Sequence, residues 1–162
     1  MQSAQGFTLI ELIATVVLIA IVSTLAIPAW QSSVQRSQVA SDARTLSQAF
    51  TLARSEAVTR GVQVSVCPLS MTAAATRCGD DWQDGWLVYL GNSDNFQTDK
   101  RLRVYQGSQA REIAGKSTRV TFNPRGMASA FSSWSFCSGD HGMSIFLARS
   151  GRIGKIPKGS CQ

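Results

Sequence analysis

Apolar positions follow two different periods along the chain, and the change falls near Gly61. Residues 12–35 contain no Lys, Arg, Asp or Glu. As a helix this stretch extends about 36 Å, more than the hydrocarbon core of a membrane at about 30 Å. Further along, apolar residues recur at spacings of four and three, which draws one stripe along a helix. The stripe consists of Val39, Ala43, Leu46, Phe50, Ala53 and Ala57. Together the two segments predict one helix from about Phe7 to Arg60, whose second half packs against a domain.

Two residues modify this predicted helix. Pro28 has no amide hydrogen and its ring clashes with the preceding turn, so a kink or local unwinding is expected near residues 23–27. Gly61 is predicted to end the helix, because glycine adopts the left-handed cap conformation at least cost. Glu56 and Arg60 stand in the favourable i, i+4 order for an ion pair just before that end.

Beyond Gly61 the period becomes two, as in half-buried strands. Residues 62–67 alternate in this way, with three valines on one face. A Gly-Asn-Ser-Asp-Asn segment separates residues 85–90 from 101–105 and is typical of a long hairpin turn. Further short strands are predicted at residues 119–122, 131–137, 144–148 and 152–156. Many short strands after one long helix predict an α+β protein with a C-terminal antiparallel sheet domain.

All four cysteines lie in the predicted sheet domain. They are Cys67, Cys78, Cys137 and Cys161. An even number in an exported domain indicates disulfides. Three connectivities are possible, and the two local pairs are favoured, Cys67 with Cys78 and Cys137 with Cys161. A zinc site is the alternative, but Cys-x-x-Cys is absent and the only histidine, His141, has no spacing partner.

An acidic residue stands at the edge of the uncharged stretch. Residues 6–11 read Gly-Phe-Thr-Leu-Ile-Glu, and a carboxylate at the centre of a membrane helix is unfavourable by roughly 2.5 to 3.5 kcal/mol. Such a group usually has a partner, which an ordinary membrane anchor would not explain. A secretory signal is also disfavoured, because residues 1–6 have no Lys or Arg and the apolar run is too long. The motif closely resembles that of the type IV pilins and pseudopilins.

This resemblance implies roles for three residues. Prepilin peptidase is expected to cut after Gly6 and to methylate the new N-terminus at Phe7. Glu11 is expected to pair with the N-terminal amine of a neighbouring subunit during filament assembly. The leader departs from the family pattern because it carries no Lys or Arg, which weakens the positive-inside bias that sets orientation.

The resemblance also implies a division of the chain. Residues 1–6 would be the leader, 7–35 a transmembrane and assembly helix, 36–61 its amphipathic continuation and 62–162 a periplasmic or extracellular β domain. The implied location is the inner membrane, crossed once with the domain in the periplasm, and then the pilus or cell surface.

Several blocks in the domain narrow the resemblance to the GspH/FimT-type minor pilins. They are residues 53–61 (Ala-Arg-Ser-Glu-Ala-Val-Thr-Arg-Gly), 64–67, 85–89, 102–103 and 120–126 (Val-Thr-Phe-Asn-Pro-Arg-Gly). The similarity extends over nearly the whole chain, from Gly6 to Lys155. It implies a low-abundance subunit that helps to initiate assembly near a filament tip.

Charge is distributed unevenly over the predicted domain. Five acids and no base lie between Cys78 and Asp99, whereas residues 100–162 contain eleven bases and two acids. Such a gradient predicts a polyanion or an acidic neighbouring subunit as the partner of the C-terminal half. Residues 149–158 hold four cations among glycines, which allow a backbone to approach phosphate closely. These cations are Arg149, Arg152, Lys155 and Lys158, and Lys116, Arg119 and Arg125 extend the set if their loops lie on the same side.

Some FimT-type pilins carry a C-terminal Gly-Arg-x-Arg motif linked to DNA binding in natural transformation. Gly151 and Arg152 match its start, but Gly154 occupies the fourth position and Lys155 follows one place later. This departure keeps the charge but not the bidentate arginine geometry. The basic stretch predicts DNA binding, with a solvated basic edge and docking to an acidic pilin as alternatives.

Catalytic motifs such as Gly-x-Ser-x-Gly and the P-loop are absent from the sequence. The chain is therefore predicted not to be an enzyme, and no cofactor or metal is expected. Trp82, Trp86 and Trp134 are expected in the core or at subunit contacts. The main prediction is a minor type IV pilin that helps to initiate or cap the pilus and binds DNA non-specifically. The alternatives are a purely structural priming pilin and a GspH-like pseudopilin of a type II secretion system. The expected partners are other pilins, prepilin peptidase, the inner membrane before assembly, and DNA.

Overall fold

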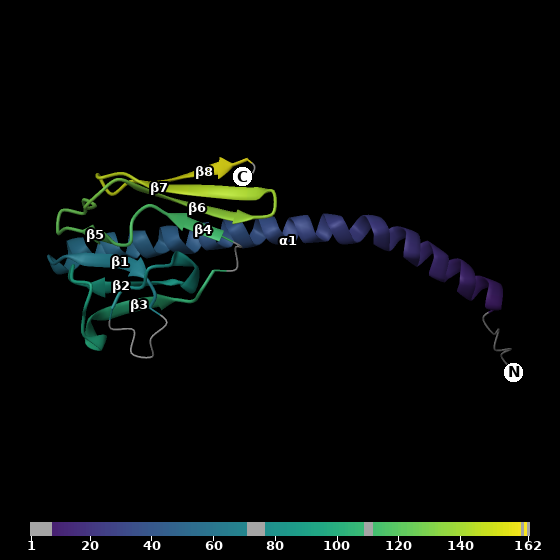
Figure 1. Cartoon of the computed structure of the whole chain (residues 1–162), viewed down its shortest axis with the longest axis horizontal. Helices are drawn as coiled ribbons and strands as arrows, with labels where there is room; N and C mark the ends of the chain where they lie inside the picture. The colour runs from purple at the N-terminus through teal and green to yellow at the C-terminus, as the bar shows by residue number, and fades with distance from the viewer. Residues whose placement is uncertain (1–7, 71–76, 109–111, 160, 162) are drawn as a thin grey trace, which may run out of the picture. The chain divides into compact units, whose positions relative to one another are not determined.

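The computed structural model describes residues 8–70, 77–108, 112–159 and 161 (Figure 1). Its contacts divide the chain into two units, Met1–Val34 and Gln35–Gln162. The first unit is named the stem and the second the head. Helix α1 (Leu9–Arg60) contributes residues to both units, which confirms the single long helix predicted from the sequence.

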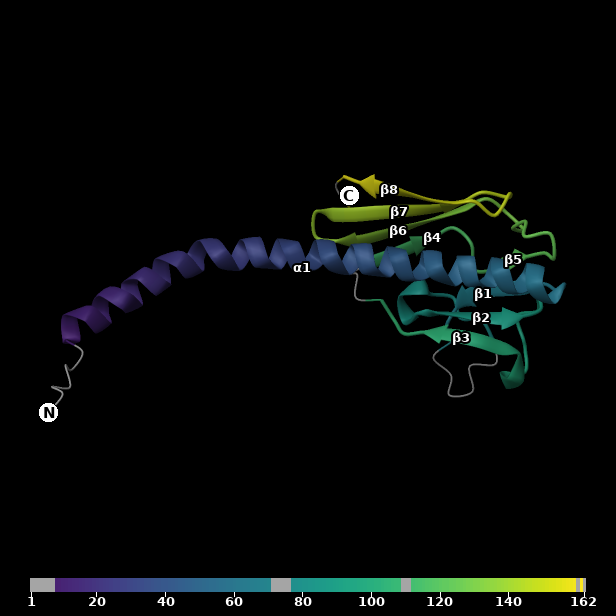
Figure 2. The same cartoon turned by 180° about the vertical axis from the view of Figure 1, so that it is seen from behind.

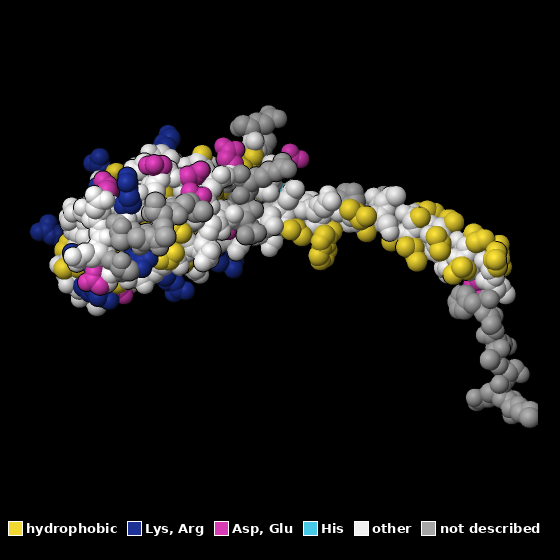
Figure 3. Space-filling view, turned by 60° about the horizontal axis from the view of Figure 1, so that its bottom comes forward, with side chains coloured by type: hydrophobic (Ala, Val, Ile, Leu, Met, Phe, Trp, Pro, Cys, Tyr) yellow, Lys and Arg dark blue, Asp and Glu magenta, His cyan; other side chains and the backbone are white. Residues whose placement is uncertain are grey.

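The stem is helical from Leu9 onward, and those of its Leu, Ile and Val side chains that the structure describes are exposed. The hydroxyl groups of Thr15, Ser23 and Thr24 donate to helix carbonyls three or four residues earlier, at 2.7–2.8 Å. These polar side chains are therefore satisfied inside the helix. What remains on the surface of the stem is mainly hydrocarbon, as Figure 3 shows in yellow.

The local unwinding predicted near Pro28 is wrong. Helix α1 continues through residues 23–27 and past position 28, because proline removes a single amide donor and the helix bonds on either side hold the conformation. The kink stays a prediction. In the part of the chain that the structure describes, no helix combines the length and the apolar character needed to cross a membrane. The transmembrane character predicted for residues 7–35 is therefore not confirmed.

The head contains two four-stranded antiparallel sheets (Figures 1 and 2). The first has the strand order β3-β2-β1-β5 and the second β4-β6-β7-β8. The first sheet consists of β1 (Val64–Pro68), β2 (Trp86–Leu90), β3 (Arg101–Tyr105) and β5 (Val120–Phe122). The second consists of β4 (Glu112–Gly115), β6 (Ser132–Ser138), β7 (His141–Leu147) and β8 (Ile153–Lys158). Short 3₁₀ helices, η1 (Trp82–Asp84) and η2 (Thr98–Lys100), precede β2 and β3. The α+β fold is confirmed.

The apolar stripe of α1 forms the centre of the core. Its six residues are at most 2% exposed and pack with residues from both sheets. The centroid of the Phe50 ring lies 4.6 Å from the ring centroid of Trp134 in β6 and 6.4 Å from that of Phe122 in β5. Trp82 adds an edge contact to Trp134 at 5.4 Å. Such aromatic pairs contribute about 0.5–1.5 kcal/mol each beyond the burial of their area. Phe50 therefore joins the two sheets, and these tryptophans are core residues, as predicted.

The two sheets differ in what covers their outer faces. On the first sheet, Cys67, Leu87 and Tyr89 form a second buried cluster with Phe96, which comes from the connection between β2 and β3. The Phe96 ring stacks on Tyr89 with the ring centroids 4.2 Å apart. Among the described residues, no such cluster covers the outer face of the second sheet, where Ile156 is 54% exposed.

Both predicted local disulfides are present. Cys67–Cys78 joins β1 to the connection that leads to η1, and Cys137–Cys161 joins β6 to the C-terminal tail. The sequence separations are 11 and 24 residues. Cross-links over loops of this size stabilise a protein by about 3 kcal/mol, mainly by restricting the unfolded chain.

One strand was not predicted from the sequence. Strand β4 is short and contains alanine and glycine, which have low strand propensity, so its conformation depends on pairing with β6. All the strands that were predicted are present; β3 has its predicted ends, and the ends of the rest are shifted. Strand β1 begins at Val64 instead of residue 62, and β8 extends to Lys158.

Candidate functional sites

The start of α1 is capped by the residues around Glu11. Thr8 precedes the helix, and its Oγ1 accepts a hydrogen bond from the Glu11 amide at 3.4 Å. The Thr8 carbonyl accepts from the amides of Glu11 and Leu12 at 3.1 and 3.2 Å. Thr-x-x-Glu is the capping-box pattern, in which the acid stands at the third helical position. Gly6 and Phe7, the predicted processing residues, lie outside the described residues.

Glu11 therefore has two separate physical roles available to it. Its negative charge is favourable at the N-terminal end of the helix dipole, by about 0.3–1 kcal/mol. Because Glu11 is also exposed, a cation from outside the chain can reach its carboxylate. Glutamine keeps the capping-box pattern but removes the charge, so Glu11→Gln tests whether the charge itself is needed.

Two turns of the head meet the last part of α1. Nη1 of Arg54 donates to the Gly151 carbonyl at 3.1 Å. A Cβ atom on Gly151 would lie 2.3 Å from the Gly126 carbonyl oxygen, so the two turns pack backbone to backbone. The Ala128 amide donates to the Arg149 carbonyl at 2.9 Å, which joins the same two turns again.

This junction places four exposed arginines at one end of the head, named here the arginine end. Its members are Arg54, Arg125, Arg149 and Arg152. Gly126 and Gly151 adopt φ angles of +75° and +77°, the left-handed conformation that favours glycine. The sequence contains no Asp or Glu between residues 113 and 139 or after residue 140. Neither turn therefore carries an acid that would neutralise its arginines.

The two lysines of β8 do not share a face with each other. In the register of β7 and β8, Lys155 stands opposite Ile145 and Lys158 opposite Gly142. Ile145 is buried in the core, so Lys155 lies on the inner side of this edge strand. Alternation places Lys158 on the outer face, with Phe146. The four cations of residues 149–158 are thus divided between two faces and a turn.

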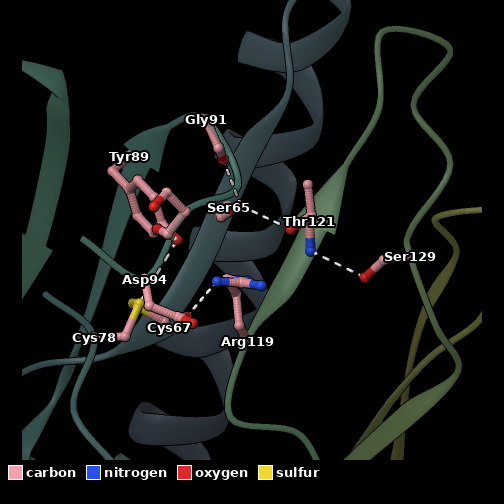
Figure 4. Close-up of polar contacts among 10 residues, drawn as sticks. Ser65, Cys67, Cys78, Tyr89, Gly91, Asp94, Arg119, Thr121 and Ser129 are labelled. Atoms are coloured by element: carbon pink, nitrogen blue, oxygen red, sulfur yellow. Dashed lines mark hydrogen bonds and ion pairs between the residues drawn. A yellow bond between two sulfur atoms is a disulfide. The ribbon is translucent and has the colours of Figure 1, made fainter. Parts of the chain in front are cut away.

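Arg119 belongs to a polar network on the first sheet, away from the arginine end. Its Nη1 forms an ion pair with a carboxylate oxygen of Asp94. Beside it, the Ser65 hydroxyl donates to the Gly91 carbonyl at 2.6 Å and lies 2.8 Å from the Thr121 hydroxyl (Figure 4). The Arg119 charge is therefore already opposed within the head.

Tyr89 completes this network. Its phenol donates to the Ser93 carbonyl at 2.8 Å, and burial raises the pKa of the phenol above its usual value. The group stays neutral and remains a donor at pH 7. Figure 4 shows these residues beside the Cys67–Cys78 disulfide. Their contacts hold the connection between β2 and β3 against β1, which is a structural role.

Lys116 is also separated from the tail cations. It directly follows β4, and β4 and β8 are the opposite edges of the second sheet. Lys116 lines a surface cavity together with Asp80 and Asp81, whose charges oppose its own. Figure 3 shows the same mixture, with Lys and Arg side chains interspersed with Asp and Glu over the visible face of the head.

The sequence prediction missed Arg54, although it lies within the residue 53–61 block that carries the resemblance. Arg54 stands four residues after Phe50 of the apolar stripe, and nothing local showed which turn it would meet. The presence of glycine at position 154 has a structural reason. A Cβ atom at this position would lie 2.0 Å from Cζ of Phe146. The Phe146 ring thus occupies the space that an arginine would need at the fourth position of Gly-Arg-x-Arg.

Known proteins share both the sequence pattern and the fold. A family model described as type II transport protein GspH matches residues 42–151, and one for the prokaryotic N-terminal methylation motif matches residues 1–27. The type IV minor pilin FimU of Pseudomonas aeruginosa strain PAO1 is 23% identical, with a TM-score of 0.61 over 78% of this chain and 97% of that one. The minor pseudopilin EpsH from the type 2 secretion system of Vibrio cholerae is 13% identical, with a TM-score of 0.51 over 74% and 97%. At these identities the two structures show a common fold.

A long helix packed on a two-sheet head, preceded by an N-terminal methylation motif, defines a protein of the pilin class. The GspH model covers more than half of the residues, so the chain belongs to the GspH family. It is a minor type IV pilin or a GspH-like pseudopilin. Proteins of this class are structural subunits that assemble with other pilins after processing by prepilin peptidase at the methylation motif.

Proposed function

We propose that the protein is a minor type IV pilin that enters a filament through its stem and holds DNA at the arginine end of its head. The observation that carries the DNA part is the junction of Arg54 with the turns at Gly126 and Gly151. The junction brings arginines from three separate segments of the chain to one end of the head. Binding there requires no particular base sequence, because phosphate contacts carry no sequence information.

The stem supplies the assembly function. Its exposed apolar side chains are buried against the stems of neighbouring pilins in the filament, and in the inner membrane before assembly, because burial removes their surface from water. Prepilin peptidase removes residues 1–6 and methylates Phe7. Glu11 then pairs with the N-terminal amine of a neighbouring subunit. Residues 36–61 and the β domain of residues 62–162 stay outside the membrane.

Arginine suits the DNA role because its planar guanidinium donates two parallel hydrogen bonds to a phosphate. Contacts of this kind give weak binding, with a dissociation constant of about 10⁻⁴ to 10⁻⁶ M near physiological salt. For duplex DNA, four phosphate contacts make the logarithm of the association constant fall with log salt at a slope of about −3.6. Each lost cation lowers the magnitude of this slope by about 0.9.

The test is fluorescence anisotropy with the full-length protein in a neutral detergent, two duplexes of unrelated sequence and a series of salt concentrations. We expect Arg149→Ala and Arg152→Ala each to weaken binding to both duplexes equally and to reduce the salt slope. Arg103→Ala is the matched control. Arg103 is an exposed arginine on β3 whose guanidinium carbon lies 5.3 Å from the centroid of the Tyr105 ring, so, like Arg152, it is an exposed arginine beside an aromatic ring.

The DNA function fails if affinity is independent of salt, or if Arg103→Ala weakens binding as much as Arg152→Ala does. In cells, Arg152→Ala is expected to lower DNA uptake while the number of pili is unchanged. A loss of pili in this variant would favour the second candidate function, a priming subunit or pseudopilin whose arginine end docks an acidic neighbour. The GspH family model favours this candidate.

A further inference from the structure

The outer face of the second sheet, which no second cluster covers among the described residues, carries an aromatic ring that reaches over the neighbouring strand beside an arginine. Phe146 of β7 stands opposite Gly154 of β8. A Cβ atom on Gly154 would lie within 2.0–2.8 Å of three Phe146 ring atoms, so the ring lies directly over the β8 backbone. The guanidinium carbon of Arg152 lies 6.0 Å from the ring centroid.

Alternation along β8 extends this face away from the arginine end. Positions 152, 154, 156 and 158 share one side of the strand, so Arg152, Gly154, Ile156 and Lys158 form a line. Arg152 and Lys158 are then about 20 Å apart. Two cations thus flank a floor made by Phe146, the Gly154 backbone and the side chain of Ile156, which is 54% exposed.

We infer that this face binds single-stranded nucleic acid, with a base stacked on Phe146 and the sugar-phosphate backbone running from the arginine end past Arg152 toward Lys158. The inference rests on the proposed DNA function and names the form of nucleic acid that the site takes. Non-specific single-strand sites combine a cationic track with aromatic rings on which bases stack. In a duplex the faces of the bases are occupied by neighbouring bases, so only a single strand can use the ring.

The composition of the face favours a nucleic acid over the head of another subunit. The positions of β6 and β7 that share this face include Ser133, Ser135 and Ser144, and the hydroxyls of Ser135 and Ser144 lie 3.2 Å apart. Among the described strand positions of β6, β7 and β8 on this face, Phe146 and Ile156 are the large apolar residues, which is little for the hydrophobic centre of a stable protein interface. The cations of this face, Arg152 and Lys158, lie along β8, whereas its acid, Glu112, lies on β4 at the opposite edge of the sheet. The β8 side of the face therefore complements a polyanion.

The experiment compares a fluorescent oligothymidylate with a duplex of the same length, both titrated with the full-length protein in detergent at one salt concentration. We expect Phe146→Leu to weaken single-strand binding by about 5- to 150-fold, the effect of losing one stacked base. Duplex binding is expected to change less than twofold. Phe146→Tyr keeps a ring and is expected to retain the single-strand affinity. Arg152→Ala weakens both forms, and Arg103→Ala weakens neither.

Each outcome decides the inference. Selective loss with Phe146→Leu and retention with Phe146→Tyr support it. If Phe146→Leu leaves single-strand binding unchanged while Arg152→Ala weakens both forms, the stacking inference is overturned and the proposed function stands. If the unsubstituted protein binds neither form, both fail. Loss of duplex binding in Phe146→Leu also overturns the inference, because the ring would then serve the fold. So does a Phe146→Leu variant that binds DNA normally but no longer enters pili, because the ring would then serve a subunit contact. Circular dichroism of each variant shows whether the head is folded.

Discussion

Replacing Gly151 by alanine tests the junction on which the arginine end depends. The substitution adds one methyl group at a position with φ of +77°. The added Cβ atom would lie 2.3 Å from the Gly126 carbonyl oxygen and 2.9 Å from Nε of Arg54. The first of these is a backbone atom, so relief requires the two turns to move apart.

The expected magnitude has two parts. Placing a non-glycine residue in the left-handed conformation costs roughly 1–2 kcal/mol. Overlap with packed neighbours adds about 1–3 kcal/mol, as for overpacking elsewhere in proteins. The head should therefore lose about 2–5 kcal/mol of its free energy of unfolding. Gly61→Ala isolates the first part, because Gly61 has φ of +67° but nothing within 4 Å of an added Cβ.

The assay is thermal unfolding followed by near-ultraviolet circular dichroism, which reports on the buried tryptophans of the head. One kcal/mol shifts Tm by roughly 3–5 °C for a domain of this size, so Gly151→Ala should melt well below Gly61→Ala. Because the turns separate, Gly151→Ala should also weaken DNA binding, whereas Gly61→Ala should not. Gly159→Ala, where an added Cβ meets nothing, serves as a neutral control. Equal Tm values for Gly151→Ala and Gly61→Ala would show that the two turns are not in rigid contact, and the argument for the arginine end would fail.

Three further predictions concern the stem and the tail. Mass spectrometry of the mature protein should show an N-terminus at methylated Phe7, and Gly6→Val should block cleavage; normal processing of that variant would contradict the assigned site. Glu11→Gln should enter sheared pili as poorly as Glu11→Ala if assembly needs the charge, because glutamine keeps the capping-box pattern; normal incorporation of Glu11→Gln would assign the residue to capping alone. Replacing both Cys137 and Cys161 by serine should lower the free energy of unfolding, measured in urea, by about 3 kcal/mol, given a loop of 24 residues. An unchanged urea midpoint would show that this disulfide adds no stability.

Features with a regular period or a short sequence separation could be predicted from the sequence. The apolar stripe on α1 could be predicted because a helix repeats its core face every three or four residues. All six residues of the stripe are buried. Both disulfides join the nearest cysteines along the chain. The ion pair of Glu56 with Arg60 is likewise local, and its atoms lie 2.5 Å apart.

Features set by contacts between distant segments could not be predicted. Arg54 and Gly151 are 97 residues apart in the sequence, and no periodicity links a helix residue to a particular turn. Arg119 was grouped with the tail cations by charge alone. Its pairing with Asp94 depends on the connection between β2 and β3 folding back over β1. Strand β4 was missed for the same reason, since its conformation depends on β6.

The folded chain explains why the tail departs from the Gly-Arg-x-Arg motif. A cation that moves one place along a strand moves to the opposite face, so Lys155 cannot replace an arginine at position 154. The glycine at that position instead accommodates the Phe146 ring. In the proposed DNA site, Arg54 and Arg125 supply cations in its place, from α1 and from the turn before β6. A variant that restores the motif with Gly154→Arg should therefore gain no affinity for duplex DNA, because the new side chain must displace the ring. Tighter duplex binding by this variant, with the head still folded, would show that the motif acts through its sequence spacing and that the arginine end is incidental.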